Sequence, residues 1–489
     1  MSFNIISEQF IPVVLSDGSK DELNLLDTLK KAHLIKEISL ECSNHLRQFA
    51  LYRFLSVLAA DITRPVTVDD ILDIYESGKF EASLLDKYFE DYRGRFDLYD
   101  DRHPFMQTPK ELFKDMDKAK VKADGLEPVL RDGTNDIFYN PVHYLKSMYE
   151  WDEKSLAIQL IQFQMHHLRT GAGYKAPFGG GSGRTPVYIL YKGNNLYQTL
   201  VFGMRPVNDA DIPIWRRDGF GYRCEISDMN FSFYPTIKVH LDKDDHGYIY
   251  MESDNTNPLF KEVESVNDKL NTCNPHTICY RSKDGKNYVE SAKMDIKPWM
   301  TLGTLYSSSH IINDGINRSS LVINELYKEN LLPETLAVEY YGMDVRNTPY
   351  VMIYERYENI DFSMIIDEVK QQNIDRLLNF IKKSNDALVK NIENWLKDYM
   401  ELYESFKASG AFADASRRFY KKSEHYFLTK VMCGDIGDIG KHISAIGDIA
   451  MDIYDSLPEV DRSILFRMKY RKKLDFDMKK EADKCIAQK

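Results

Sequence analysis

The sequence predicts an α+β protein in two parts: a large mixed α/β domain over residues 1–360 and an all-α four-helix bundle over residues 361–489. Two observations predict this division. Up to about residue 360, glycine, proline and other turn-forming residues separate short apolar stretches, which is typical of mixed strands and helices. Beyond that residue the turn signals thin out. Apolar residues there recur at helical spacing in four long stretches joined by short breaks, which favours an up-and-down bundle.

Near the N-terminus, strands, helices and loops are expected in a definite order. Residues 10–18 predict a strand that ends at an Asp-Gly turn, with a helix directly after it. Apolar residues at three- and four-residue spacing predict a long helix through residues 46–62 and shorter helices around Ile71–Tyr75 and Ala82–Tyr88. Residues 97–145 are rich in Pro, Gly, Asn and Asp and are expected to form loops.

The middle of the chain combines a clear helix with several expected hairpins. The helix covers about residues 153–169. Residues 185–191 and 196–202 are expected to pair as a hairpin, and residues 280–294 predict two more strands around an Asp-Gly turn. Further on, a helix followed by strand, loop and strand is expected over residues 321–358.

The first helix of the expected bundle shows its buried face most clearly. Its apolar side chains repeat at steps of seven, four and three residues and therefore fall on one face: Ile381, Leu388, Ile392, Leu396, Tyr399, Leu402 and Phe406. Three more helices are expected at roughly 411–432, 437–456 and 457–482.

The charge of the chain argues against a protein that coats nucleic acid through its average field. It carries 64 Lys and Arg against 75 Asp and Glu, a net charge of −11. The acidic excess lies in the first 360 residues, because residues 361–489 hold 23 basic and 22 acidic side chains. Any contact with nucleic acid must therefore come from local basic patches. There is no apolar run of ~18 residues and no signal-peptide pattern, so a cytoplasmic protein without membrane contact is expected.

A run of three glycines, Gly179–Gly181, lies between two basic residues, Lys175 and Arg184. Glycine runs cost backbone entropy and suit places where the backbone approaches a ligand closely. An NTP-binding loop is disfavoured. The stretch is one residue short of the phosphate-binding pattern, has Arg184 in place of its Lys, and leads into a strand. Two interpretations stay open: a flexible loop, or a backbone surface that lies against a phosphate or a base edge.

Two stretches of the bundle, residues 416–422 and 467–473, are strongly basic. Each places several cations and an aromatic residue on one or two helical turns, so each is either a solvated helix face or a track for a DNA or RNA backbone. The cations of interest are Arg417, Arg418, Lys421, Lys422, Arg471 and Lys472. The loop aromatics Phe138 and Tyr139 are also open to two interpretations, burial in the core or stacking on an unpaired base.

The sequence offers little for catalysis or metal binding. The patterns GxSxG and HExxH are absent, and the six cysteines contain no CxxC pair. His166 and His167 are adjacent, so on a helix they would point about 100° apart and could not share a metal. We therefore expect free thiols, no metal, no cofactor and no enzymatic activity.

Eight stretches of the chain match, in this order, the pattern of a known family. The most specific are HPFMQT at His103–Thr108 and APFGGGSGRTPV at Ala176–Val187. The supporting stretches are FIPV near the start, TNDIFYN at Thr134–Asn140, NPHTICYRSKDG at Asn274–Gly285, KPWMTL near Trp299, RNTPYVMIYER near Arg346 and SRRFYKKSE at Ser416–Glu424. Over nearly its whole length the chain thus resembles the family of large subunits of the type I-E CRISPR Cascade surveillance complex.

The resemblance implies both a fold and a function. The family has a large mixed α/β N-terminal domain and a C-terminal four-helix bundle, in agreement with the division near residue 360. Its members are one-copy subunits of a complex that contains a guide RNA and backbone, handle-binding and small subunits. They read the protospacer-adjacent motif (PAM) on double-stranded target DNA, open the duplex and help to recruit a separate helicase-nuclease. They are not nucleases themselves.

The resemblance also implies which residues contact DNA. The PAM-reading loop would consist of Phe178, Gly179, Gly180 and Gly181, which would approach the minor groove. Only a backbone without side chains fits there, and the groove is read degenerately, which suits a permissive motif. A β-hairpin wedge beneath the PAM would have its tip at Arg346, Asn347 and Thr348. The family's best-known wedge carries a glutamine that is absent here, so a structural subunit that does not read the PAM stays an alternative.

Contacts with the guide and with the DNA backbone complete the expected interface. The loop at Phe138, Tyr139 and Asn140 would dock on the 5′ handle of the guide RNA and on the neighbouring subunit. Lys175, Arg184 and the six bundle cations named above are expected to contact the DNA backbone.

Overall fold

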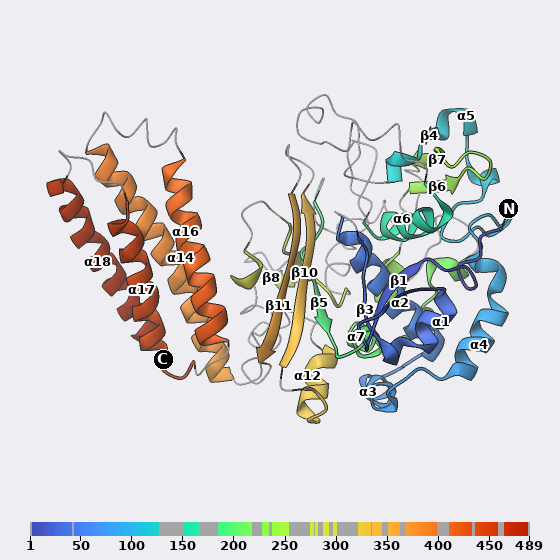
Figure 1. Ribbon diagram of the computed structural model, residues 1–489, viewed down its shortest axis with the longest axis horizontal. Coiled ribbons are helices and arrows are strands. Elements are labelled where there is room, and N and C mark those ends of the chain that lie inside the picture. Colours follow the sequence, from blue (N-terminus) through green and yellow to red (C-terminus); the bar gives the residue numbers. More distant parts are fainter. Residues whose placement is uncertain are drawn as a thin grey trace. The chain divides into compact units, whose positions relative to one another are not determined.

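The protein is a mixture of helices and small sheets, which confirms the expected α+β class. The chain divides into two compact units, an N-terminal unit (Met1–Ile296 with His310–Glu358) and a helical unit (Lys297–Ser309 with Asn359–Lys489). Figure 1 shows the computed structural model. It describes residues 2–41, 44–126, 151–166, 184–217, 227–233, 237–253, 274–277, 279–281, 287–292, 297–300, 321–333, 335–344, 351–361, 368–398, 410–432, 436–457 and 464–487.

A three-stranded sheet begins the N-terminal unit. Its spatial order is β2 (Lys20–Leu23), β1 (Ile11–Leu15) and β3 (Ile35–Ile38), and both neighbouring pairs are antiparallel. The predicted strand and turn are confirmed, but the predicted helix does not follow the turn directly. Gly18 takes a positive φ of 86° that reverses the chain, so the polar stretch after it pairs with β1. The helix α1 (Leu25–Lys30) starts only after Asn24, whose side chain accepts a hydrogen bond from the Asp27 amide.

Helices form the core next to this sheet. The long helix α2 (Leu46–Thr63) is confirmed and is buried on nearly all sides, as expected for a helix that is apolar around its whole circumference. It packs against α6 (Glu153–His166), the described part of the helix predicted to reach residue 169. The two shorter predicted helices are confirmed as α3 (Val68–Ser77) and α4 (Ala82–Asp91).

A second sheet has the order β11 (Val351–Asp361), β10 (Thr335–Asp344) and β5 (Tyr188–Lys192). The strand–loop–strand prediction is confirmed by β10 and β11, and the helix expected before them is α12 (Leu321–Lys328). The hairpin predicted for residues 185–202 is wrong, because β5 pairs with β10 and the following stretch forms the helix α7 (Leu196–Phe202). The physical reason is a helix cap: the side chain of Asn195 accepts a hydrogen bond from the Gln198 amide.

Smaller elements complete the N-terminal unit. Residues 97–126 are mainly loops and short helical turns, as expected, and they include α5 (Met116–Ala119). A third sheet has the order β4 (Lys120–Lys122), β7 (Tyr248–Ser253) and β6 (Ile237–Leu241). The strand pair predicted around residue 285 is confirmed by the antiparallel β8 (Cys279–Arg281) and β9 (Asn287–Val289). A short helix, α8 (Asp228–Phe231), precedes β6.

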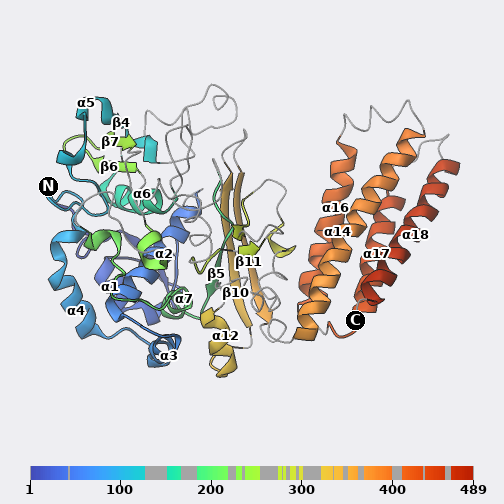
Figure 2. The same ribbon diagram turned by 180° about the vertical axis from the view of Figure 1, so that it is seen from behind.

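Four long helices lie side by side in the helical unit, as Figures 1 and 2 both show. They are α14 (Glu368–Lys397), α16 (Ala411–Tyr426, extended by a π-helical turn over Phe427–Val431), α17 (Ile439–Asp455) and α18 (Ile464–Ala487). Helix α14 packs against each of the other three. The predicted helices are thus confirmed, and the structure describes the last of them from Ile464 onward.

The core of the helical unit follows the predicted apolar face. Ile381, Leu388, Ile392 and Leu396 are each at most 1% exposed, while the other three residues of that predicted face lie outside the described part of the chain. One side chain of this core comes from a segment that is distant in the sequence. The segment 297–300 belongs to this unit, and its Trp299, 2% exposed, packs on Phe427 with ring centroids 5.5 Å apart.

Candidate nucleic-acid interface

Arg184 and Asp344 join two distant parts of the chain. Arg184 follows the glycine tract in sequence, and Asp344 is the last residue of β10, directly before the expected wedge segment. The two residues form an isolated antiparallel β-bridge, and Nε of Arg184 donates to Oδ2 of Asp344 at 2.9 Å. Next to the bridge, the Thr185 amide donates to the Met343 carbonyl at 2.9 Å, and the Met343 amide donates to the Thr185 hydroxyl at 2.8 Å. Arg184, three residues after the glycine tract, and Asp344, two residues before the expected wedge tip, are therefore held together at one point.

The Arg184–Asp344 pair is largely shielded from water. The side chain of Asp344 is 2% exposed and that of Arg184 is 23% exposed. An acid at this place has a sequence signal that we overlooked, because the strand before it, Tyr340–Met343, is otherwise buried and apolar apart from its tyrosine hydroxyls. A carboxylate that ends such a strand needs a cation or hydrogen-bond donors. The guanidinium of Arg184 is thus engaged within the protein.

The cations of α16 fall into two groups. Arg417 and Lys421 are exposed and lie one helical turn apart, so they share a face, and Lys422 is exposed beside them. These three side chains form no ion pair with the described part of the chain. Arg418 instead donates from Nη2 to the Ser456 hydroxyl at the end of α17, at 2.7 Å. The inner side of this turn is fixed by Phe419, which is fully buried.

The basic stretch of α18 is mostly used inside the helical unit. Arg471 forms a two-pronged ion pair with Asp455, with both N···O distances at 2.7 Å, and this hydrogen bonding raises the pKa of Arg471. Arg467 donates to three carbonyls at the end of α17, including that of Asp455 at 2.6 Å. Lys469 pairs with Asp398 at 3.3 Å, and the hydrogen bond from Tyr470 holds the pKa of that carboxyl below its ordinary value.

The exposed side chains that remain on the outer face of α18 are less suited to contact a phosphate backbone. Lys472 is exposed and forms no ion pair with the described residues. Beside it, however, Leu465, Met468 and Phe476 are 81%, 55% and 64% exposed. A row of phosphates leaves such side chains in water, because it offers no apolar surface to cover them. The outer face of α16 therefore fits a backbone track better than that of α18.

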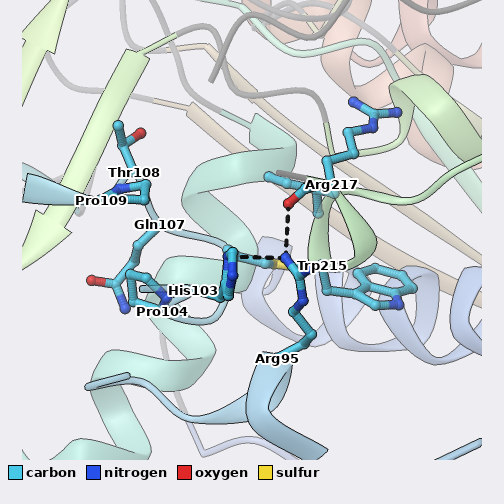
Figure 3. A pocket seen from close by; sticks show the side chains of 10 residues that line it. Arg95, His103, Pro104, Gln107, Thr108, Pro109, Trp215 and Arg217 are labelled. Atoms are coloured by element: carbon cyan, nitrogen blue, oxygen red, sulfur yellow. Dashed lines mark hydrogen bonds between the residues drawn. The ribbon is translucent and has the colours of Figure 1, made fainter. Parts of the chain in front are cut away.

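The motif HPFMQT lines a small pocket of the N-terminal unit, shown in Figure 3. Three segments form it: Arg95 of the 3₁₀-helix η2 (Arg93–Phe96), residues 103–109, and the turn around η7 (Ile214–Arg216). Nη1 of Arg95 bonds to Nδ1 of His103 at 3.0 Å and donates to the backbone carbonyl of Arg217 at 3.2 Å. The motif is recognisable in the sequence, but its partners on η2 and η7 are brought to it only by the fold.

Comparison with known proteins decides the family. A family model described as CRISPR-associated protein Cse1 matches residues 4–432 of the chain. This chain belongs to the Cse1 family. It is 29% identical over 224 residues to the CRISPR-associated protein CasA/Cse1 of Thermus thermophilus, an alignment that covers 44% of this chain and 42% of that relative.

Solved structures of Cse1 proteins share the fold. The Cse1 of Acidimicrobium ferrooxidans gives a TM-score of 0.73 at 16% identity, with 99% of both chains covered. A chain in a CRISPR RNA-guided surveillance complex gives a TM-score of 0.72 at 18% identity, with 97% of this chain and 99% of that chain covered. The likeness extends over both units.

Most of the residues that the Cse1 resemblance singles out lie outside the described part of the chain. These are the PAM-reading set (Phe178, Gly179, Gly180, Gly181), the wedge (Arg346, Asn347, Thr348), the handle-docking loop (Phe138, Tyr139, Asn140) and Lys175. They stay predictions, as do the roles given to Arg184 and to the cations of α16 and α18. Arg184 and Arg418 are engaged by Asp344 and Ser456. The cations Arg417, Lys421, Lys422 and Lys472 are more exposed, and they form no ion pair with the described residues.

Metal-binding geometry is absent from the described residues. No three His, Cys, Asp or Glu side chains in that part of the Cse1-family chain are grouped so that they could hold a metal ion. Cys485 is a buried free thiol, and burial raises its pKa. Among the described helices, none is long and apolar enough to cross a membrane.

Proposed function

We propose that this chain is the PAM-reading large subunit of an RNA-guided surveillance complex. It recognises the PAM on double-stranded DNA, helps to open the duplex so that the guide RNA pairs with the target strand, and helps to recruit a helicase-nuclease. Membership of the Cse1 family supports the proposal, as does the likeness of the fold to a chain of such a complex. In this proposal the chain is a recognition subunit without catalytic activity, and the domain boundary lies near residue 360.

The observation that carries the proposal is the bridge between Arg184 and Asp344. Reading a motif and prying apart the next base pair require two elements at a fixed spacing, because adjacent base-pair steps lie only a few ångströms apart. Here Arg184, which follows Gly179–Gly181 in sequence, and Asp344, which precedes Arg346–Thr348, are held together although they are about 160 residues apart. The bridge itself is a feature of this chain, and the roles of the two segments are those that the family resemblance implies.

Each segment then has a physical role. Phe178 and the three glycines lie against the minor groove, where a Cβ would clash and where the degenerate base edges allow a permissive motif. Arg346, Asn347 and Thr348 enter the stack beneath the PAM. Strand exchange between a DNA duplex and an RNA–DNA hybrid is nearly balanced, so a modest wedge is enough to start it.

The remaining contacts hold the guide and the DNA backbone. Phe138, Tyr139 and Asn140 dock on the 5′ handle of the guide RNA and on a neighbouring subunit. Arg417, Lys421 and Lys422 on α16 contact DNA phosphates, with Lys175 and Lys472 as further contacts. Arg418 and Arg471 act mainly by fixing α16 and α18 to α17, because both are already hydrogen-bonded there. Local cations in a chain of net charge −11 avoid strong non-specific DNA binding.

The test compares the guide-loaded complex assembled with and without this chain. Binding is measured to duplex targets with randomised bases beside the protospacer. We expect base preference to appear only when this chain is present. Base preference that persists without the chain would contradict the proposal and would favour a structural subunit that seats the guide and recruits the nuclease.

A further inference from the structure

A network of largely buried charges joins two sheets of the N-terminal unit. Its four members are Glu37 on β3, Lys192 on β5, Glu339 on β10 and Arg356 on β11. We propose that this charge network is a positioning device for duplex opening, because it holds β10 and β11 in the orientation that opening requires. This role rests on the proposed function, in which the wedge residues 346–348 lie between these two strands in sequence.

Arg356 is the centre of the charge network. Its Nη1 donates to Oε2 of Glu37 at 2.8 Å and to Oε1 of Glu339 at 3.1 Å. Its Nε donates to Oε1 of Glu358 at 2.5 Å, and the second oxygen of Glu339 accepts from the Tyr341 hydroxyl at 2.6 Å. One guanidinium thus connects β11 to its neighbour β10 and also to β3, which belongs to a different sheet.

Lys192 supplies the second positive charge. Its ammonium donates to the Tyr52 hydroxyl and lies 3.9 Å from Oε2 of Glu37. The same hydroxyl accepts from the Ile38 amide at 2.9 Å, so Tyr52 on α2 links Lys192 to β3. Burial lowers the pKa of Lys192, and the negative charges of Glu339 and Glu37 act against that shift. The second sheet is therefore tied to the first through β5 as well as through β11.

Stability alone gives little reason for this arrangement. The side chains of Glu339 and Lys192 are 0% and 4% exposed, and those of Glu37 and Arg356 are 24% and 30% exposed. Charges lose favourable hydration when they are buried, and apolar side chains of similar volume often stabilise a protein equally well. Hydrogen bonds between charged groups do fix direction, because they require a particular geometry whereas apolar contacts tolerate several. We therefore assign the network to orientation.

The charge network lies where a change of orientation has a large effect. Glu339 is five residues before Asp344, the last residue of β10, and Arg356 is five residues after Val351, the first residue of β11. At about 3.3 Å per residue this is a lever of roughly 17 Å. A tilt of about 10° would displace the strand ends by about 3 Å, close to the ~3.4 Å between successive phosphates along one DNA strand.

The test separates duplex opening from DNA binding in the guide-loaded complex. The double variant Lys192→Met with Glu339→Gln removes one charge of each sign and leaves the Glu37–Arg356 pair balanced. Aminopurine fluorescence reports the opening of the first protospacer base pair in a closed duplex. We expect opening to be about tenfold slower than in wild type. A target whose first protospacer pairs are mismatched is already open, and we expect the double variant to bind it with wild-type affinity.

The matched control makes the same substitutions in an exposed ion pair of this unit, Lys20→Met with Glu41→Gln. Its charges lie 3.0 Å apart, and the two side chains are 69% and 85% exposed. We expect this control to open the closed duplex at the wild-type rate. Arg356→Lys is a second test variant, because it keeps the charge but loses the fork that holds two carboxylates, and it is expected to slow opening several-fold.

Wild-type opening rates in the double variant and in Arg356→Lys would overturn the inference. An equal loss on the mismatched target, or in the exposed control, would overturn it as well, because either would indicate general destabilisation. Unfolding midpoints show whether the double variant folds, and Arg356→Lys supplies the comparison if it does not. Opening by the wild-type complex without base preference would contradict PAM reading, whereas equal opening rates contradict only the role of the charge network.

Discussion

The ion pair between Arg184 and Asp344 shows how one contact can join two residues that lie far apart in the sequence. The sequence marked Arg184 as a possible phosphate contact because it follows the glycine tract, and nothing there indicated Asp344 as its partner. The pairing of residues so far apart depends on the register of β5 against β10, which local patterns do not determine. Motifs could therefore name the candidate residues but could not say which of them the protein itself engages.

Removing either member of this pair is expected to destabilise the N-terminal unit. The two substitutions are expected to differ in their cost to the free energy of unfolding. Arg184→Gln leaves an almost fully buried carboxylate without its guanidinium and is expected to cost about 2–4 kcal/mol. Asp344→Asn leaves a cation that water still reaches and is expected to cost about 1 kcal/mol. Urea unfolding of both variants and of the double variant measures the difference. If Arg184 serves only as a DNA contact, Arg184→Gln will lower DNA affinity and leave stability unchanged.

His240 predicts a pH dependence of stability. It lies on β6 next to the HPFMQT segment, with Nδ1 at 3.0 Å from the Thr108 carbonyl, and burial lowers its pKa to about 4. Its ordinary pKa is about 6.5. The unfolded chain therefore takes up a proton before the folded chain does, and stability falls as the pH drops from about 6.5 to about 4, by about 3 kcal/mol at most.

His240→Asn tests this pH dependence. The Asn side chain can still donate to the Thr108 carbonyl, but it does not titrate. Unfolding midpoints are compared at pH 7 and pH 4.5 for both proteins. We expect the acid-induced loss to be smaller in the variant, and an unchanged loss would exclude His240 as its source.

The helices show which elements a sequence reveals and which it leaves ambiguous. Helix α14 was predictable because thirty residues repeat one apolar face, and α2 because its apolar residues extend over eighteen. The seven residues of α7, five of them apolar, were mistaken for a strand, since a short apolar run fits either structure, and the cap at Asn195 was the signal that distinguishes them. Strand β2 was missed because Lys20, Asp21 and Glu22 lack any strand pattern and pair only through the Gly18 turn.

The outer face of α16 carries a prediction of its own. Arg417→Glu combined with Lys421→Glu is expected to weaken binding of the assembled complex to its DNA target. It should also flatten the dependence of log affinity on log salt by about 2, because two phosphate contacts are lost. Arg418 is left unchanged because it holds Ser456.

The matched control places the same charge change on α14, with Lys382→Glu and Lys390→Glu, two exposed residues of the same unit. Affinity is measured at several salt concentrations for all three proteins. An equal effect of the two double variants would indicate bulk charge rather than a track on α16.

At the scale of the whole molecule, the two structural units do not correspond to two continuous stretches of the sequence. The bundle helices were predicted, but the segment 297–300 joins them from the middle of the chain and places Trp299 against Phe427. No periodic pattern could show this, because four residues carry no period. Phe427 is the first residue of the π-helical turn that extends α16.

Trp299→Ala is expected to destabilise the helical unit by about 3–5 kcal/mol, because it empties the space of a large buried side chain. Met300→Ala, at a half-buried neighbour, is the control and is expected to cost much less. Hydrogen exchange of the α16 and α17 amides measures the stability of this unit separately. Equal protection in wild type and Trp299→Ala would show that the segment contributes nothing to the unit.

The central claim, that the glycine segment of this protein reads the PAM, is tested most directly with Gly180→Asp. The substitution adds a side chain and a negative charge where the backbone is proposed to meet the minor groove. Gly94→Asp is the control, because a Cβ at Gly94 meets no atom within 4 Å. Binding of each guide-loaded complex to a library of randomised PAM sequences is measured. We predict that base preference collapses for Gly180→Asp and persists for Gly94→Asp; preference that survives in Gly180→Asp would contradict the claim.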